Sequence, residues 1–413
     1  MRFIKDHKQV SHVVMVAALI TALVAGSSRL RADTGDCGGS MITLPFTDVP
    51  SSNVFFCSIA EAYLSALTNG TDATHYSPSS NVPREQMAAF ITRTMDQTLK
   101  RGSRRAALNQ YWTTQGERNL SLTSLGTGAT LVKSDGTDVW VGNSADDLVV
   151  RVQASDGKFL ANYINATEAF GVLCALGKVF VTGRTSPGSL YQIDQSIPPS
   201  GSVLTLSNAL GGFPEGIAFD GQRIWTANVG STSASVSIIS LSPTAVTTVL
   251  FNGSTDLHGI VFDGANMWVT EDISGAVDKL HRLDANGVIL QTVDVGSNPK
   301  YPAFDGTNIW VPNVSSNTVT VVRAIGGLAG TVLATLSGNG LQSPTSAAFD
   351  GERILVTNHA NSGSVSLWNA TDLTPIGTFP TGGTTFPFGA CSDGLNFWIT
   401  LNIFGVSGRL ARF

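Results

Sequence analysis

The sequence contains few charged residues. Asp, Glu, Lys and Arg make up 13% of its 413 residues, about half the roughly 25% typical of globular chains. The net charge of −5 is spread thinly, so there is no basic stripe to hold a phosphate backbone, and we expect no nucleic-acid binding. Cysteine is scarce too, with four residues, and no spacing of Cys with His suggests a zinc site.

Glycine is abundant, with 43 residues, and part of it lies in a segment that recurs after residue 130. The segment is typified by PEGIAFDGQRIWTAN at 214–228. It returns as LHGIVFDGANMWVTE (257–271), PKYPAFDGTNIWVPN (299–313) and PTSAAFDGERILVTN (344–358). Seven copies align on one aromatic position at intervals of 40 to 45 residues: Trp140, Phe180, Trp225, Trp268, Trp310, Leu355 and Trp398. Strand-like repeats of this period predict a mainly β fold, a seven-bladed β-propeller.

Each repeat is consistent with four strands. In the third copy, GIAF and IWTA flank an Asp-Gly turn, and two alternating stretches follow at 234–241 and 245–251. Asp-Gly between two β-rich runs is a strong hairpin signal, because Gly accepts the positive φ of a tight turn. The first two runs are apolar without alternation, as expected for inner strands packed on both faces. The outer two alternate, so we expect one face of each to meet water.

The last repeat predicts how the ring closes. It has inner strands at 388–390 and 397–400 and a third at 408–413, but no fourth strand. The segment RNLSLTSLG at 118–126, just before the first repeat, resembles the outer strand GTVLATLSG at 330–338 and has no other partner. Supplying it to the seventh blade would remove an open edge. We therefore expect a propeller over 117–413 closed by the strand at 118–126.

The start of the chain has the pattern of a targeting segment. Arg2, Lys5 and Lys8 precede the apolar run at 13–25, which is short for a bilayer span and is followed by small residues. We interpret residues 1–32 as a secretory signal peptide with cleavage after Gly26 or Ala32, and predict export to the cell surface, envelope or periplasm. A retained N-terminal anchor is the alternative.

Export bears on the cysteines. Cys37 and Cys57 are the only pair outside the propeller. In an oxidising compartment a disulfide between them would stabilise the fold by about 3 kcal/mol, and whether it forms is left open. Cys174 and Cys391 lie in predicted inner strands of blades two and seven, where buried thiols acting as small apolar residues are expected.

Residues 33–97 form a separate module. Ile59, Ala60, Tyr63, Leu64 and Leu67 share one face of a helix predicted over 58–67 that Gly70 ends, and Pro83 stands where a second helix can begin. The apolar face of this second helix consists of Met87, Phe90, Ile91 and Met95.

The block at 45–97 resembles a single S-layer homology module along essentially its whole length. The matching elements are FTDVP at 46–50, the helix, Asn69-Gly70, Tyr76-Ser77-Pro78 and VPREQMA at 82–88. This resemblance implies contact with envelope or cell-wall polysaccharide. From the family's Thr-Arg-Ala-Glu motif only Arg84 and Glu85 carry over, and the Arg implies contact with anionic sugar substituents. Arg84 as a solvated first-turn residue is the alternative, and Phe55-Phe56 stands where His-Trp is frequent.

Residues 98–116 are interpreted as a linker. Lys100, Arg101, Arg104 and Arg105 give the region a positive cluster that could touch anionic glycan or lipid headgroups. A solvated helix extension is the alternative.

Propeller geometry predicts two rings of residues on one face, around the central channel. The strand-start ring holds the residue that begins each first strand: Thr130, Phe170, Glu215, His258, Lys300, Thr345 and Phe388. The strand-end ring holds the residue that ends each second strand: Asn143, Gly183, Asn228, Glu271, Asn313, Asn358 and Leu401. Polar residues concentrate on blades three to five, where we expect Glu215, His258, Glu271 and Lys300 to converge.

These repeats resemble YVTN and NHL propellers, in particular the virginiamycin B lyase group. In that group a His at a strand start is the base, and acidic residues two before it and at the next strand end hold magnesium. Asp256, His258 and Glu271 stand at those places. Two carboxylates holding Mg²⁺ could stabilise an enolate-like charge while the imidazole removes a proton. The alternative is structural, with these side chains and the Asn residues bonding across adjacent blades.

Two functions therefore remain. The first is an envelope-associated, non-catalytic binding or scaffold protein without a cofactor. In this reading Glu215, Lys300, Asn228, Asn313 and Asn358 face a ligand or protein partner. The second is a magnesium-dependent carbon–oxygen lyase or hydrolase that uses His258 with Asp256 and Glu271.

Overall fold

The computed structural model divides the chain into two compact units, Met1–Arg101 and Gly102–Phe413. The residues that the structure describes are 33–37, 40–64, 68–84, 86–88, 91, 123–154, 157–194, 201–230, 233–251, 253–254, 256–360, 362–382, 385–403 and 406–413. The predicted signal peptide (1–32) and linker (98–116) lie outside them. Within the described ranges, no helix has both the length and the apolarity needed to cross a membrane.

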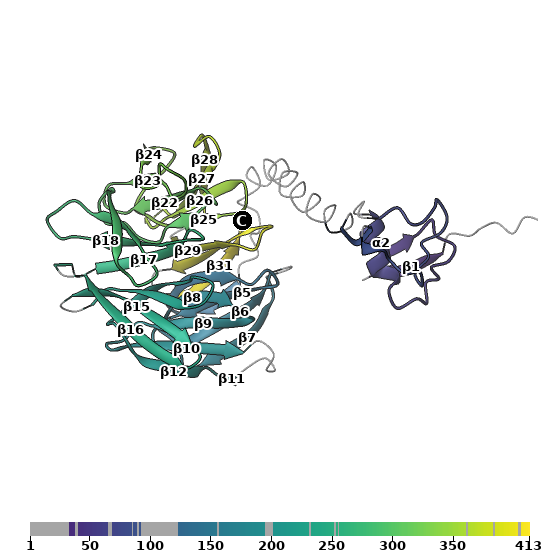
Figure 1. The fold of residues 1–413 in the computed structure, drawn as a ribbon, viewed down its shortest axis with the longest axis horizontal. Helices are drawn as coiled ribbons and strands as arrows, with labels where there is room; N and C mark the ends of the chain where they lie inside the picture. Colours follow the sequence, from purple (N-terminus) through teal and green to yellow (C-terminus); the bar gives the residue numbers. More distant parts are fainter. Residues whose placement is uncertain are drawn as a thin grey trace, which may run out of the picture. The chain divides into compact units, whose positions relative to one another are not determined.

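The second unit is a seven-bladed β-propeller, as the repeats predict (Figure 1). Its blades are four-stranded antiparallel sheets, and blade one gains a short fifth strand that pairs parallel to its outer strand. The strands of blades one and two are β4 (Ala129–Ser134), β5 (Asp138–Asn143), β6 (Leu148–Gln153), β7 (Phe159–Ile164), β8 (Ala169–Ala175), β9 (Lys178–Gly183), β10 (Gly188–Asp194), β11 (Gly201–Ser202) and β12 (Leu204–Leu210). Blade one contains β4 to β7 and β11, and blade two contains β8, β9, β10 and β12.

Blades three to six follow in chain order. Their strands are β13 (Pro214–Phe219), β14 (Ile224–Asn228), β15 (Ala234–Leu241), β16 (Thr244–Phe251), β17 (Asp256–Phe262), β18 (Met267–Asp272), β19 (Lys279–Leu283), β20 (Ile289–Asp294), β21 (Ala303–Phe304), β22 (Asn308–Asn313), β23 (Thr318–Arg323), β24 (Val332–Leu336), β25 (Pro344–Phe349), β26 (Arg353–Asn358), β27 (Ser364–Asn369) and β28 (Pro375–Pro380). The third strands are more buried than their alternation predicts: β15 is buried over its first six residues, and only the outer strand β16 is mostly exposed. Neighbouring blades therefore cover three strands of the sheet.

The seventh blade is closed by a strand from the other end of the unit. It contains β29 (Thr385–Ser392), β30 (Phe397–Ile403), β31 (Val406–Arg412) and β3 (Thr123–Gly126). Thr123 pairs with Leu410, and Ser124 with Arg409. This is the pairing that the unmatched segment before the first repeat predicts, although residues 118–122 of that segment lie outside the described ranges.

In five of the seven repeats the Asp-Gly turn and the Trp that follows it form one structural device. In blade three Asp220 Oδ1 accepts hydrogen bonds from the backbone N–H groups of Gln222 and Arg223, while Oδ2 accepts one from Trp225 Nε1 at 2.8 Å. Gly221 has the positive φ, 94°, that the turn requires. The same Asp-to-indole bond is present in five blades, from Asp135, Asp220, Asp263, Asp305 and Asp393.

The aligned aromatic positions form the centre of the blade cores. All seven residues, from Trp140 to Trp398, are fully buried. In blade six Leu355 replaces the Trp, and the free oxygen of Asp350 instead pairs with Arg353 at 2.7 Å. The two propeller cysteines are free: Cys391 is buried, and burial raises the pKa of the Cys174 thiol to about 12, so both behave as apolar groups.

The first unit combines a hairpin of β1 (Thr34–Cys37) and β2 (Ser40–Thr43) with α2 (Phe56–Leu64). Its core consists of Leu44, Phe46, Val49, Phe56, Ile59 and Ala60. Asp48 accepts hydrogen bonds from the backbone N–H groups of Tyr76 and Ser77, at 2.9 and 2.7 Å. Although burial raises its pKa, these bonds hold the pKa of Asp48 below its usual value. They join two of the motifs on which the S-layer homology resemblance rests.

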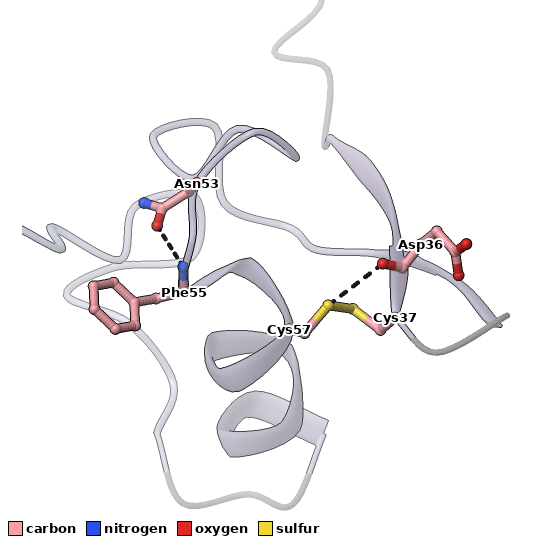
Figure 2. Close-up of a disulfide and its surroundings, with 5 residues drawn as sticks. All are labelled: Asp36, Cys37, Asn53, Phe55 and Cys57. Carbon is pink, nitrogen blue, oxygen red and sulfur yellow. Dashed lines mark hydrogen bonds between the residues drawn. A yellow bond between two sulfur atoms is a disulfide. The ribbon is translucent and has the colours of Figure 1, made fainter.

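A disulfide between Cys37 and Cys57 links β1 to α2, with 5.5 Å between the Cα atoms (Figure 2). Figure 2 also shows the turn before the helix, in which Asn53 Oδ1 accepts a hydrogen bond from the N–H of Phe55 at 2.9 Å. The pairing that the sequence left open is thus present.

The helix differs from its prediction. It begins at Phe56 rather than residue 58, and Phe56, Ile59, Ala60 and Tyr63 contact the core. Leu64 was expected on this face, but it is 64% exposed. Phe56 lies one turn before Ile59 and Ala60, and the buried stripe runs from Phe56 to Tyr63. Leu67, Phe90 and Met95 lie outside the described residues, and Met87 and Ile91 are exposed.

Candidate functional site at the channel mouth

The strand-start ring is positioned by threonines of neighbouring blades. Each of four threonine hydroxyls near the end of a second strand donates to the backbone carbonyl of the ring residue in the next blade. The pairs are Thr182 with Glu215, Thr270 with Lys300, Thr357 with Phe388, and Thr400 with Thr130. These bonds, between 2.8 and 3.3 Å, fix the backbone from which the ring side chains project.

Glycine after the ring residue lets adjacent blades approach closely. A Cβ on Gly216 would lie 2.6 Å from the carbonyl oxygen of His258, and one on Gly259 would collide with the carbonyl oxygen of Lys300. Only Gly fits such a contact. The sequences Glu-Gly and His-Gly at successive strand starts therefore bring Glu215, His258 and Lys300 together.

Glu215 is the centre of a buried charged group. Its Oε2 lies 2.8 Å from His258 Nδ1 and accepts a hydrogen bond from the Tyr301 hydroxyl at 2.9 Å, while Oε1 accepts one from Arg184 Nε at 2.8 Å. Burial raises the pKa of Glu215, but the bond to His258 and the charges of His258, Arg184 and Lys300 outweigh it and lower the pKa to about 2. We call Arg184, Glu215, His258, Lys300 and Tyr301 the mouth cluster.

The partners of His258 define its tautomer. Because Nδ1 faces the ionised Glu215, that nitrogen carries the proton, and Nε2 is left as the acceptor toward Lys300 Nζ at 2.7 Å. Burial lowers the pKa of Lys300, partly offset by Glu215, Asp272 and Asp256, whose negative charges raise it. The cluster thus holds an imidazole between a carboxylate and an amine.

Two carboxylates flank this group. Asp256 and Asp272 are paired residues on β17 and β18. The pKa of Asp272 is raised overall. Burial and the charges of Asp278 and Asp256 raise it more than Lys300 and His258 lower it. Asp272 is therefore the carboxylate at the end of β18 whose charge interacts with Lys300 and His258. It lies one residue beyond the strand-end ring.

Glu271 points elsewhere. Its Oε2 lies 2.5 Å from His281 Nε2 on β19, and Phe251 packs against the His281 ring. In the described ranges no three His, Cys, Asp or Glu side chains form a group that could hold a metal, and Asp256, His258 and Glu271 all belong to these ranges. The expected convergence of Glu271 with His258 is not present, because adjacent strand residues face opposite sides.

The asparagines of the strand-end ring are structural. Asn228 Nδ2 donates to Ser235 and Ser237, Asn313 Nδ2 to Thr318 and Thr320, and Asn358 Nδ2 to Ser364 and Ser366. All three are fully buried. In the structural alternative such bonds cross between adjacent blades. Those of Asn228, Asn313 and Asn358 join the second and third strands of one blade, whereas Asn143 Nδ2 of blade one donates to the carbonyl oxygen of Leu125 on β3 of blade seven.

Glu271 and His281 replace this asparagine device in blade four. Strand pairing makes Glu271 equivalent to the three asparagines, and His281, opposite Val269, equivalent to Thr320, which is opposite Val311. Blade four therefore holds an ionisable pair where three other blades hold a neutral one.

Three aromatic rings from different blades pack together at the mouth cluster. Phe170, Tyr301 and Phe388, from blades two, five and seven, contact one another with ring centroids 5.6 to 6.2 Å apart. A cavity of about 50 Å³, lined by first-strand residues of every blade, includes Tyr301 in its wall. Tyr301 is buried, and burial together with Glu215 raises its pKa well above the usual value. The mouth cluster thus lies beside packed aromatic rings.

Arg184, Tyr301 and Asp272 were missed by the sequence reasoning. Each directly follows a ring residue in the chain: Gly183, Lys300 and Glu271. The prediction assigned one residue of each strand to a ring. The following residue in the chain can reach the same surface where the regular strand stops. In the first unit, Arg84 is exposed, as glycan contact requires, and Glu85 lies outside the described residues.

Comparisons with known proteins support the fold. No family model matches the chain, and no curated protein matches it either. Among solved structures it is similar to Kuenenia stuttgartiensis hydrazine synthase, at 17% identity and a TM-score of 0.57 over 70% of this chain and 95% of that one. It is also similar to the β-propeller domain of Myceliophteria thermophila Cps50 (Swd1), at 9% identity and a TM-score of 0.56 over 71% of this chain and 99% of that one.

A computationally designed protein, Ika8, matches at 13% identity and a TM-score of 0.51, over 71% of this chain and 98% of that one. The chain is a β-propeller protein. At such low identities the similarity extends to the fold alone.

Proposed function

We propose that this protein is an exported, envelope-associated binding protein. Its propeller binds a ligand or protein partner at the mouth cluster without turnover, and its first unit contacts envelope polysaccharide. The observation that carries the proposal is the mouth cluster, in which two cationic side chains and an imidazole surround a buried carboxylate.

The energetic cost of this cluster supports a functional role. Burying Glu215 removes a carboxylate from water, which is costly unless the charge is paired. Other positions of the same ring are filled by Thr130, Thr345 and Phe388, which build equivalent strands without buried charge. Perturbed ionisable groups of this kind concentrate at binding and active sites.

The envelope part of the proposal rests on the first unit. Arg84 is exposed, the S-layer homology resemblance covers residues 45–97, and the Cys37–Cys57 disulfide suits an oxidising compartment. A guanidinium can hold an anionic sugar substituent through charge-assisted hydrogen bonds.

A lyase or hydrolase that uses His258 is the second candidate. The orientation of His258 by a buried carboxylate favours it, because a general base is commonly held in this way. The residues do not fit the magnesium site that this reading expects, since Glu271 is engaged by His281. We therefore derive no step through a metal.

Co-sedimentation tests the envelope contact. The full chain should sediment with purified envelope polysaccharide of its host at low salt, and Arg84→Ala should weaken this, whereas Arg409→Ala, an exposed Arg of the propeller, should not. Sedimentation that is equal for the two variants would argue against Arg84 as the contact.

A thermal-shift screen tests the propeller site. Small hydroxy acids, oxo acids and monosaccharides would be added to wild type and to Lys300→Met. A compound that raises the melting temperature of wild type only would support ligand binding at the mouth cluster. Equal shifts in both proteins would place binding elsewhere.

A further inference from the structure

Glu215, His258 and Lys300 form a relay of the kind that activates nucleophiles. Glu215 Oε2 lies 2.8 Å from His258 Nδ1, and Nε2 on the opposite side of the ring lies 2.7 Å from Lys300 Nζ. An acid that orients an imidazole against a nucleophilic atom at hydrogen-bond distance is the arrangement found in acyl-transfer sites. Here the third member is an amine.

We propose that Lys300 is a reactive amine that captures a small oxo acid as a reversible imine. The inference rests on the proposed ligand-binding role of the mouth cluster and names the chemical class of its ligand.

The surroundings of Lys300 favour the free amine more than water does. Burial and the charge of Arg184 favour the free amine, while Glu215, Asp272 and Asp256 favour the ammonium form, and the balance lowers the pKa of Lys300. A desolvated lysine beside another cation is a recognised way to make an amine nucleophilic at neutral pH. His258 adds a proton acceptor at contact distance.

The step is balanced without any further reagent. The Lys300 nitrogen attacks the carbonyl carbon and a C–N bond forms, while one N–H proton passes through His258 Nε2 to the carbonyl oxygen and gives the carbinolamine. The second N–H proton follows the same route to the carbinolamine hydroxyl group, which leaves as water as the C=N bond forms. Amine and carbonyl compound thus give imine and water, and hydrolysis reverses the step.

Arg184 indicates that the ligand carries a carboxylate. Its side chain is 39% exposed, and only Nε donates to Glu215. Among the contacts of the described residues, Nη1 and Nη2 make no hydrogen bond, while the guanidinium rests on the rings of Phe170 and Phe213. A guanidinium held in this way can present two N–H donors to a carboxylate. An oxo acid would combine this contact with the carbonyl carbon that Lys300 requires.

Reductive trapping tests the proposal. The full chain would be incubated with glyoxylate and cyanoborohydride at pH 7, and labelled lysines would be located by peptide mass spectrometry. Lys158 and Lys279 of the same propeller serve as internal controls. Since histidine-assisted proton transfer contributes roughly 10²–10⁴-fold in enzymes, we expect Lys300 to react at least about tenfold faster than either control. Labelling of Lys300 no faster than of Lys158 would overturn the proposal.

Two variants separate chemistry from folding. Lys300→Arg keeps the positive charge and should lose the label at this site only. His258→Gln keeps the amine and should slow labelling of Lys300 without changing that of Lys158. Unchanged labelling of Lys300 in His258→Gln would contradict the relay.

Two further probes separate this inference from the proposed binding role. Glycolaldehyde, a neutral aldehyde of similar size, should label Lys300 more slowly than glyoxylate, and Arg184→Gln should remove this preference. Glycolate has the carboxylate but no carbonyl group. A glycolate-dependent rise in melting temperature without glyoxylate labelling would retain the ligand site and refute the imine. Labelling that is not saturable in glyoxylate would refute a bound oxo acid.

Discussion

At the scale of single residues, blade four places an ionisable pair where other blades place a neutral pair. Glu271 and His281 occupy the positions at which Asn313 and Thr320 form a neutral pair. A buried pair of opposite ionisable groups is strongly coupled, because removal of one partner leaves the other without compensation.

This coupling predicts the outcome of a substitution cycle. Glu271→Asn and His281→Ser should each lower the free energy of unfolding by about 1–3 kcal/mol, since each leaves a buried polar partner without its bond. The double substitution recreates the pair of other blades and should cost less than the sum by about 1 kcal/mol. Urea unfolding of the four proteins measures this coupling, and strict additivity would contradict it.

The pKa of Glu215 predicts an acid-dependent stability. Its folded value of about 2 lies below the usual 4.5. The contribution of this carboxylate is therefore fully present above about pH 4.5 and is lost as pH falls toward 2. In Glu215→Gln this contribution is absent at every pH. Denaturant unfolding at pH 7 and pH 3 should show a larger difference between wild type and variant at pH 7, and an equal difference would contradict the paired state.

At the scale of secondary-structure elements, the Asp-Gly hairpin supports five of the seven blades through a hydrogen bond from the buried Trp. One carboxylate holds the turn backbone and the buried indole of the next strand, as Asp305 does for Trp310. The aromatic residue that recurs in the sequence and the Asp five residues before it are thus the two partners of one contact.

Removing this contact should destabilise the propeller. Asp305→Ala leaves Trp310 Nε1 and two backbone N–H groups without their acceptor, which should cost about 1–3 kcal/mol. Asp372→Ala is a matched control, because Asp372 caps an exposed turn through Thr374 and should cost less. The two variants would be compared by thermal unfolding, and a similar loss in both would argue against the role of the indole bond.

The repeats predicted the fold more completely than the site. The 40- to 45-residue spacing and the Asp-Gly turns determine seven sheets, and the ring geometry placed Glu215, His258 and Lys300 together. The direction of Glu271 could not be predicted, because it depends on which of two adjacent residues at the end of β18 faces the channel. The role of Tyr301 depends on an irregular blade: β21 is only two residues long, and Tyr301 bridges to Ser346 of blade six.

At the scale of the whole molecule, the ring depends on a contact between its two ends. β3 pairs with β31, and Leu125 packs in a core with Trp398 and Leu410. A propeller without this strand would expose the backbone edge of β31, which could pair with other chains.

Deletion of residues 118–126 should therefore lower both stability and solubility. We expect a lower melting temperature and concentration-dependent aggregation, measured by calorimetry and light scattering. Leu125→Ala is a milder variant that keeps the strand and should cost about 2–4 kcal/mol through the cavity it leaves. Unchanged melting and solubility in the deletion variant would remove β3 as the closing strand.

The closing strand also affects when folding can finish. Thr400 and Thr130, which join blades seven and one, are 270 residues apart in the chain, and contacts of such separation form slowly because a large loop must close first. During synthesis the N-terminal strand has no partner until the end of the unit has emerged. An unpaired strand in a nascent chain invites misassembly. Six blades can therefore form progressively, whereas the seventh, and with it the closed ring around the mouth cluster, can form only after synthesis of the unit is complete.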